Sequence, residues 1–253
     1  MKAGARSRAL LVGVPKTTWL DGQLAELPGV EVDVQRMADF LSGEGFDATV
    51  VCDPVQPTAD RVRSELAKIV DATEAGDLSV IYLSGHGYRI PDEDGVEIDT
   101  WDEVFVCADG PIVDDWFRDR LWNTSQPASS MVVMVDACHS ATSVLEAFPD
   151  LRRDHSPIVR AVRSTANYRL VLSACADEEV SLQQSPTVGS VVTNEMLGLL
   201  AEQRGRSYRE LWTTLADLVP ARFSAAGRPQ LDTFGPDDRL VDSVAFGTTL
   251  RPI

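Results

Sequence analysis

The stretch LSVIYL at 78–83 is followed at once by Ser84-Gly85-His86-Gly87, and the stretch MVVMV at 131–135 is followed by Asp136-Ala137-Cys138-His139-Ser140. Each apolar run has the length and composition of a buried strand in a parallel sheet. In open α/β sheets, reactive side chains lie at the carboxyl ends of such strands. One predicted strand end therefore carries a histidine and the other a cysteine, the two groups that thiolate chemistry requires.

Strand-like and helix-like patterns alternate along the rest of the chain. Apolar runs predict strands at 9–14, 47–52, 79–83, 103–107, 131–135 and 170–173. Apolar residues at helical spacing predict helices at 32–41, 58–73, 114–121, 140–148, 194–202 and 208–218, with Thr58 as an N-cap. The tail from Gly227 has a mostly irregular pattern. This alternation predicts an α/β fold with a mostly parallel central sheet and helices on both faces.

Length and composition favour a globular enzyme-sized domain. The chain has 253 residues, of which 44% are apolar, and this suits one large α/β domain. No window approaches the ~18 uncharged apolar residues that a membrane-spanning helix needs. The apolar run Ala9–Val14 is too short for a signal peptide, so we interpret it as the first strand. A cytoplasmic protein with no membrane partner is expected.

The charge and the cysteines exclude some classes of protein. The formal net charge is −16, from 39 acidic and 23 basic residues, which disfavours a nucleic-acid partner. A solvated acidic surface and an acidic face for basic substrates both account for this charge. Cys52, Cys107, Cys138 and Cys175 form no C-x-x-C pair, so free thiols in a reducing compartment are expected rather than disulfides or a structural zinc site.

His86 and Cys138 form the predicted catalytic pair. A thiol has an ordinary pKa of roughly 8.5 and attacks as its thiolate, so a histidine in reach activates it and later protonates the leaving amine. A helix that starts near Ser140 would stabilise the thiolate further. The backbone N–H groups of Gly87 and Cys138 are the predicted donors of an oxyanion hole. Because a cysteine at a strand end is often merely structural, further motifs have to support this interpretation.

Several separated motifs accompany the pair. They are RALLVGV at 8–14, LPGVEVD at 27–33, MADFL at 37–41, SGHG at 84–87, PDEDG at 91–95, WDE at 101–103, DACHS at 136–140 and SAC at 173–175. In this order, over about residues 8–200, they resemble the prokaryotic metacaspase-type members of the caspase-like (clan CD, peptidase C14) cysteine peptidases. The resemblance implies a caspase-like (caspase–hemoglobinase) fold, with His86 as general base and Cys138 as nucleophile.

The resemblance also implies cleavage after Arg or Lys, in an acidic first subsite (S1) lined by Asp136, Asp33 and Ser84. Asp136 lies two residues before Cys138, so the two side chains are expected on the same side of the strand. A guanidinium pairs with a carboxylate through two parallel hydrogen bonds, which favours Arg over Lys. Two alternatives stay open: Asp136 as a loop-fixing carboxylate and Asp33 as an ordinary acid near the start of a surface helix.

Some family members require calcium, and Asp102, Asp114 and Asp115 match positions that bind the ion in some of them. Calcium needs about six oxygen ligands, and the further acid expected soon after the nucleophile is not evident here. The two adjacent acids also suit the first turn of a helix. We therefore expect no cofactor for the chemistry itself and retain calcium as an activator. Val30, Ala137 and Ala141 depart from the family pattern without touching the pair.

An arginine-bearing segment, 150–169, follows the predicted catalytic helix. Its arginines Arg152, Arg153, Arg160 and Arg163 are the expected processing sites. Residues 1–253 are thus predicted to form one peptidase domain, with a part like a large subunit at 1–149, a cleavable linker and a part like a small subunit at 170–253. Cleavage by the enzyme itself or by an upstream protease would activate this zymogen. A flexible connector is the alternative.

The sequence as a whole predicts a monomeric cysteine endopeptidase that cleaves proteins at exposed Arg or Lys. A bacterial stress, defence or cell-death pathway is the associated role, by analogy alone. Two alternatives remain open. One is a catalytically silent caspase-like scaffold or signalling module, against which the intact pair counts. The other is a thiol esterase or amidase for a small substrate, against which the acid at position 136 counts.

Overall fold

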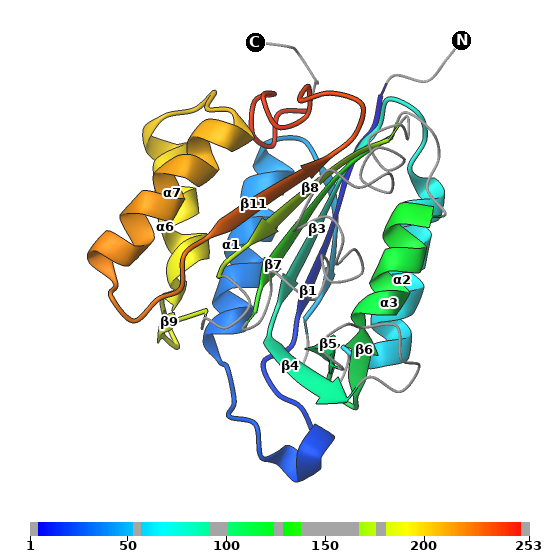
Figure 1. Ribbon diagram of the computed structural model, residues 1–253, viewed down its shortest axis with the longest axis vertical. Coiled ribbons are helices and arrows are strands. Elements are labelled where there is room, and N and C mark those ends of the chain that lie inside the picture. The colour runs from blue at the N-terminus through cyan, green and yellow to red at the C-terminus, as the bar shows by residue number, and fades with distance from the viewer. Residues whose placement is uncertain are drawn as a thin grey trace.

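A six-stranded sheet in the order β11-β8-β7-β3-β1-β2 forms the centre of the computed structural model (Figure 1). The structure describes residues 5–52, 57–91, 101–123, 129–137, 167–175 and 181–248. The strands are β1 (Ser7–Gly13), β2 (Asp47–Val51), β3 (Leu78–Ser84), β7 (Ser130–Asp136), β8 (Tyr168–Ser173) and β11 (Gln230–Phe234). All pair in parallel except β11, which is antiparallel to β8. The predicted α/β class with a mostly parallel sheet is confirmed.

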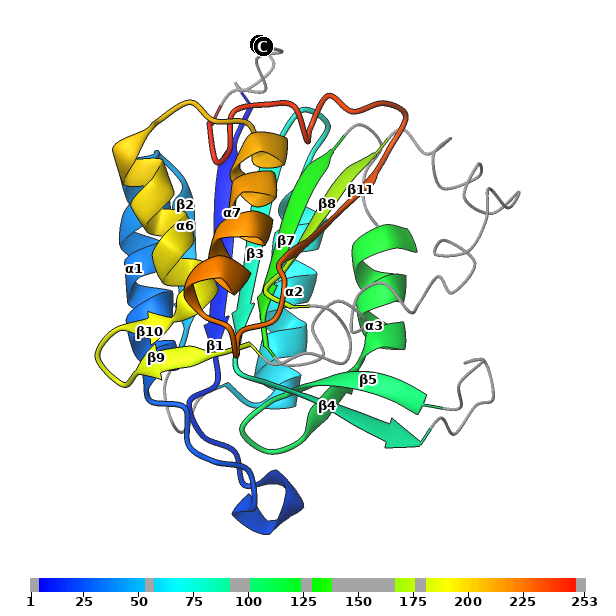
Figure 2. The ribbon, with the colours of Figure 1, turned by 60° about the vertical axis from the view of Figure 1, so that its left-hand side comes forward.

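Each face of this sheet carries its own apolar core. Successive strand residues point to opposite faces, so Tyr82 and Met134 enter one core, whereas Ile81 and Val133 enter the other. Helices α1 (Gly29–Gly43), α6 (Val191–Glu202) and α7 (Tyr208–Arg222) cover the first face. Helices α2 (Ala59–Ala72) and α3 (Asp114–Arg118) cover the second (Figure 2). Helices on both faces were expected from the alternating pattern.

Local signals at the helix ends explain where several helices begin. The Thr58 side chain accepts a hydrogen bond from the backbone N–H of Arg61, as predicted for the N-cap of α2. A capping box starts α7, in which Ser207 and Glu210 each bind the other's backbone N–H. Helix α1 begins at Gly29, three residues before the predicted start, so Asp33 lies within the helix rather than at its beginning.

Small antiparallel sheets lie at the carboxyl ends of the parallel strands (Figure 2). One contains β4 (His86–Pro91), β5 (Trp101–Val106) and β6 (Pro111–Val113), and the other pairs β9 (Gln183–Ser185) with β10 (Gly189–Ser190). The sequence predicted only the strand at 103–107. Strand β4 contains Gly, Pro and polar residues and β6 has only three residues, so neither shows an apolar pattern and their hydrogen-bonded pairing determines them.

Two further sequence predictions need correction. The tail from Gly227 is not mostly irregular at its start, because β11 pairs along the edge of the main sheet. Each β11 residue is half-buried, so the strand lacks the clean alternation that would have identified it. The helix predicted at 114–121 consists of the short α3 followed by a π-helical segment, Asp119–Asn123. The helix predicted at 140–148 lies outside the described residues.

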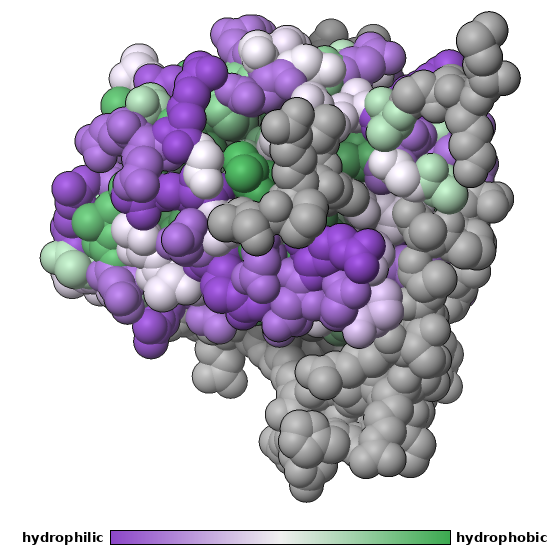
Figure 3. Space-filling model, turned by 90° about the horizontal axis from the view of Figure 1, so that it is seen from above, coloured by the Kyte–Doolittle hydropathy of each residue, from purple (hydrophilic) through white to green (hydrophobic). Residues whose placement is uncertain are grey.

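At the opposite end of the molecule, where the parallel strands begin, most of the visible described residues are hydrophilic (Figure 3). Within the described part of the chain, no helix combines the length and apolar character needed to cross a membrane. The described cysteines Cys52, Cys107 and Cys175 form no disulfide bond. Open α/β sheets place their ligand and catalytic sites at the other end, where the strands finish.

A substitution at Gly13, the last residue of β1, can test how tightly the side chains pack at the carboxyl end of the sheet. A Cβ atom there would lie 2.6 Å from Val34 Cγ2 and 2.8 Å from Cys52 Sγ. Gly13→Ala is therefore expected to lower the free energy of unfolding by about 1–3 kcal/mol, measured by urea denaturation. Gly43→Ala, where nothing lies within 4 Å, is the control and should be neutral or slightly stabilising. Equal stability of the two variants would contradict the close packing.

Candidate active site

The strand end that carries the SGHG motif (84–87) lies beside the strand end that leads into the DACHS motif (136–140). Ser84, the last residue of β3, pairs with Asp136, the last residue of β7. The backbone N–H of Gly85 donates to the carbonyl of Asp136 over 3.3 Å, and His86 and Gly87 then begin β4. Cys138 follows two residues after Asp136 and lies outside the described residues. The parallel pairing of β3 with β7 thus brings His86 to the strand end that leads to the cysteine.

His86 is oriented by a backbone group. Its Nε2 lies 2.7 Å from the carbonyl oxygen of Ala25, in the segment between β1 and α1. A carbonyl can only accept a hydrogen bond, so Nε2 carries the proton, and Nδ1 holds the lone pair of the neutral ring. This hydrogen bond favours the tautomer in which Nδ1 acts as the base, and the ring is half-buried. Sequence reasoning did not identify Ala25, because a main-chain carbonyl leaves no residue signature.

Asp136 is a buried carboxylate surrounded by hydroxyl groups. Its Oδ1 accepts from Ser181 Oγ at 2.6 Å, and its Oδ2 accepts from Thr193 Oγ1 at 2.6 Å and from the Tyr82 hydroxyl at 3.4 Å. The residue is only 4% exposed. A buried carboxylate is tolerated when hydrogen-bond donors replace the water that it has lost. The three donors to Asp136 are neutral hydroxyl groups, so none of them compensates its negative charge.

Asp33 lies beside this carboxylate and is completely buried. Both of its oxygens accept from the backbone N–H of Ser190, the N-cap of α6, at 3.0 and 2.8 Å. Burial, reinforced by the nearby charge of Asp136, raises the pKa of Asp33 to about 8, although the Ser190 N–H and Arg36 act in the opposite direction. The structure therefore brings together two of the predicted subsite acids, from α1 and β7, at the amino end of α6.

Tyr82 and Gly189 both lie against this pair of acids. Burial and the charges of Asp136 and Asp33 raise the pKa of Tyr82 well above its usual range, so its hydroxyl stays protonated and can donate. Gly189 has a φ of +86°, and a Cβ atom there would collide with the Asp33 carboxylate. Only glycine fits this close approach without strain. The third predicted member of the subsite, Ser84, is buried at the end of β3 on the same face as Tyr82.

The residue before the cysteine is held from the neighbouring strand. The backbone N–H of Ala174, just after β8, donates to the Val135 carbonyl at 3.0 Å. The buried thiol of Cys175 donates to the carbonyl of Ala137 over 3.5 Å. The Cys175 thiol thus fixes the carbonyl of Ala137, the last described residue before Cys138. Of the two predicted oxyanion donors, Cys138 lies outside the described residues and Gly87 pairs with Phe105 in the small sheet.

The predicted calcium ligands lie on the small sheet and the helix beyond it. Asp102 is half-buried in β5, Asp114 is completely buried at the start of α3, and Asp115 follows it. Among the described residues, no three His, Cys, Asp or Glu side chains are grouped so that they could hold a metal ion. These three acids therefore do not form a cation site by themselves. The predicted processing sites Arg152, Arg153, Arg160 and Arg163 lie outside the described residues.

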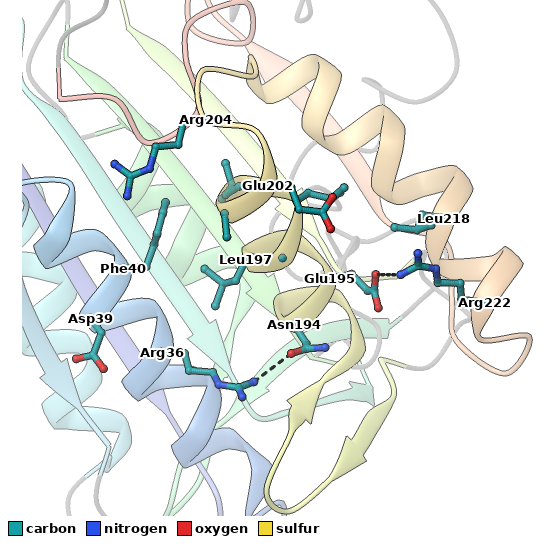
Figure 4. Close-up of a pocket in the computed structure, with 14 residues that line it drawn as sticks. Arg36, Asp39, Phe40, Asn194, Glu195, Leu197, Glu202, Arg204, Leu218 and Arg222 are labelled. Atoms are coloured by element: carbon teal, nitrogen blue, oxygen red, sulfur yellow. Dashed lines mark hydrogen bonds and ion pairs between the residues drawn. The ribbon is translucent and has the colours of Figure 1, made fainter.

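A pocket of about 600 Å³ lies on the outer side of α1, α6 and α7 (Figure 4). Arg36 spans part of it, with bonds to the Val188 carbonyl at 2.9 Å and to Asn194 Oδ1 at 3.1 Å. Glu195 pairs with Arg222 across another part, at 2.7 Å. None of the predicted site residues lines this pocket, so it is separate from the candidate active site.

Comparison with known proteins agrees with this geometry. The caspase-domain (peptidase C14) family model matches residues 6–239. Curated relatives include metacaspase-4 of Arabidopsis thaliana, 38% identical over 150 residues, and metacaspase-1A of Neurospora crassa, 33% identical over 154 residues. These matches cover 55% and 56% of this chain but only 35% and 33% of the relatives. The chain thus spans about a third of the length of the curated relatives it matches.

Solved structures show the same fold. A protein of Geobacter sulfurreducens is similar with a TM-score of 0.77 at 22% identity, covering 96% of this chain and 99% of its own. Caspase-1 of Spodoptera frugiperda is similar with a TM-score of 0.61 at 14% identity, covering 97% and 91%. At these identities the likeness concerns the fold alone. It confirms the caspase-like architecture that the sequence motifs predicted.

The acid pair predicts a specific dependence of stability on pH. Asp33 has an ordinary pKa of 3.8 when unfolded and about 8 when folded, so the folded state binds more protons between these values. The contribution of Asp33 protonation to the free energy of unfolding is complete below the pKa of the unfolded state, and it is lost as the pH rises through the pKa of the folded state. Asp33→Asn should remove this component from the free energy of unfolding, measured by urea denaturation across that range. Asp39→Asn, at an exposed acid on the same helix, is the control; an identical pH profile in Asp33→Asn and wild type would contradict the raised pKa.

Proposed function

The chain belongs to the caspase-domain family of cysteine peptidases, and on that basis we propose that it is a cysteine endopeptidase that cleaves proteins after Arg or Lys. The observation that carries this proposal is the buried pair of acids, in which Asp33 of helix α1 lies beside Asp136, at the strand ends that present His86 and lead to Cys138. A bacterial stress, defence or cell-death pathway is the proposed setting, from the family resemblance alone.

His86 and Cys138 perform the proposed chemistry. Nδ1 of His86 takes the proton from the Cys138 thiol, and the thiolate attacks the scissile carbonyl carbon. The negative oxygen that forms accepts hydrogen bonds from the N–H groups of Gly87 and Cys138. When the carbon–nitrogen bond breaks, His86 returns the proton to the leaving amine, and a water molecule then hydrolyses the thioester. The Ala25 carbonyl supports this cycle, because it holds the ring with Nδ1 as the base and stabilises the imidazolium when it forms.

The acid pair supports a preference for a cationic side chain. Asp136 retains a small exposed fraction, 4%, whereas Asp33 is completely buried behind it. We therefore propose that Asp136 contacts the substrate guanidinium or ammonium group directly. Asp33, whose raised pKa keeps it mostly protonated at neutral pH, ionises and adds negative potential when the cation binds. Ser181 and Thr193 keep the Asp136 carboxylate in one orientation. A fixed carboxylate suits the planar fork of Arg better than the flexible ammonium of Lys.

Hydrolysis of fluorogenic peptides that end in Arg, Lys or Asp tests the proposal, in the presence of calcium and of a chelator because calcium activation stays a prediction. We expect turnover in the order Arg, Lys, Asp and none in Cys138→Ala. Asp136→Asn keeps the shape of the side chain and some of its hydrogen bonds but removes its charge. It should therefore raise KM for the Arg peptide by roughly 10- to 100-fold, which corresponds to the free energy of one charge-assisted hydrogen bond.

Asp39→Asn, an exposed acid of α1, is the matched control and should leave both kcat and KM unchanged. Thermal melting of Asp136→Asn separates recognition from folding, because a carboxylate that only fixes a loop would lower stability without changing the preference for Arg over Lys. Preferential cleavage after Asp would contradict the acidic subsite. Absence of turnover in every condition would favour a catalytically silent scaffold.

Activation by cleavage within 150–169 is a second component of the proposal. Replacing Arg152, Arg153, Arg160 and Arg163 by Gln should yield a chain that does not process itself and has low activity. Inserting the recognition sequence of an unrelated protease into this segment should restore activity once that protease is added. Gel electrophoresis and peptide hydrolysis, followed together, check both effects. An uncut Gln variant with wild-type activity would show that the segment is only a connector.

A further inference from the structure

An exposed aromatic surface lies next to His86 and has no role in the chemistry described above. We define the Trp19–Tyr88 patch as Trp19, Leu20 and Tyr88. The two rings meet edge to face, with centroids 5.4 Å apart, and Leu20 and Tyr88 are 37% and 41% exposed. Large apolar side chains that are this exposed and grouped together are typical of binding surfaces.

The patch and the catalytic histidine share one face of β4. Side chains two residues apart on a strand point the same way and lie roughly 7 Å apart, which applies to His86 and Tyr88. Their contacts show the same arrangement, because His86 binds the carbonyl of Ala25 and Tyr88 packs on Trp19, and both partners belong to the segment between β1 and α1. This segment extends from the carboxyl end of the sheet beside β4 (Figure 1).

The segment that carries Trp19 is fixed to the body of the protein. Thr17 Oγ1 donates to the Cys107 carbonyl at 2.8 Å, and the backbone N–H of Thr18 donates to the Ala108 carbonyl at 2.8 Å. Its other end is closed by the Leu27 N–H, which donates to the Pro15 carbonyl at 2.7 Å. Leu20 has a positive φ of 52°, a conformation that is costly for a residue other than glycine. The fold thus presents this apolar side chain in an unfavourable local conformation.

The position of His86 determines which part of a substrate would reach the patch. His86 has to protonate the leaving amine, so the residue that follows the scissile bond lies on the His86 side of the site. The side chain that precedes the bond points to the acid pair instead. An extended substrate advances about 3.3 Å per residue, so its first two residues beyond the cut come within reach of Tyr88.

We propose that the Trp19–Tyr88 patch is a subsite that binds an apolar side chain at one of the first two substrate positions after the scissile bond. This inference rests on the proposed endopeptidase function and adds a specificity that the acid pair does not provide. The nearest charged neighbour on β4, Arg89, lies on the opposite face of the strand, where it pairs with Glu103 at 2.8 Å. Because the patch consists of two aromatic side chains and one leucine, it favours apolar side chains.

Internally quenched peptides with a constant Arg before the cut test the proposal. Leu, Phe, Gly, Ser and Asp are placed in turn at each of the two following positions, and kcat/KM is measured for each peptide with the full chain. We expect the wild type to prefer Leu or Phe over Gly by about tenfold or more at one position, as burial of a large apolar side chain implies. In Tyr88→Ser this ratio should fall to about 1.

Two further variants complete the experiment. Trp101→Ser removes an equally exposed aromatic residue (43%) that pairs with Pro91 on the opposite face of the same hairpin, and it should retain the wild-type preference. Tyr88→Lys should shift the preference toward Asp, because the new cation would occupy the patch. An Arg–coumarin substrate, which has no residues after the cut, tests the endopeptidase function independently. If it is hydrolysed but wild type and Tyr88→Ser show the same Leu-to-Gly ratio, the patch inference is wrong and the proposed function stands.

Discussion

A single buried carboxylate, that of Asp136, organises the carboxyl edge of this protein. It ends a strand whose residues are all buried, and a charge in that position is stable only when hydrogen bonds replace its lost water. The donors come from Tyr82 in β3, from Thr193 in α6 and from Ser181 before β9. The sheet, the helix and the segment after β8 are thus joined through one side chain, so the placement of α6 depends on the same group that is proposed to select the substrate.

The second acid gives this arrangement its chemical character. Asp33 could have been paired with a cation, but its direct hydrogen-bond donor is the N–H of Ser190 at the amino end of α6. Its pKa is raised first by burial and then by the neighbouring charge of Asp136, and the Ser190 N–H and Arg36 compensate only part of this effect. Such an unfavourable pair persists in a fold when it has a function, and a site that lacks one positive charge is suited to receive it from a ligand.

The main sheet and part of the site could be predicted from the sequence. Long apolar runs such as Leu78–Leu83 determine buried strands, and their polar ends mark where reactive side chains emerge. The features that escaped prediction depend on pairing or on main-chain atoms. Strand β11 forms through hydrogen bonds to the otherwise unpaired side of β8. The carbonyl that orients His86 belongs to Ala25, whose side chain gives no indication of this role. Thr193 resembles any helical threonine until the tertiary structure brings it to Asp136.

The central claim is that the acid pair recognises positive charge rather than shape. Inhibition constants of two peptide aldehydes, one that ends in arginine and one that ends in its neutral isostere citrulline, test this claim most directly. We expect the arginine aldehyde to inhibit the wild type about 100-fold more tightly than the citrulline aldehyde, and we expect this difference largely to disappear in Asp136→Asn. Equal inhibition of the wild type by both aldehydes would contradict it.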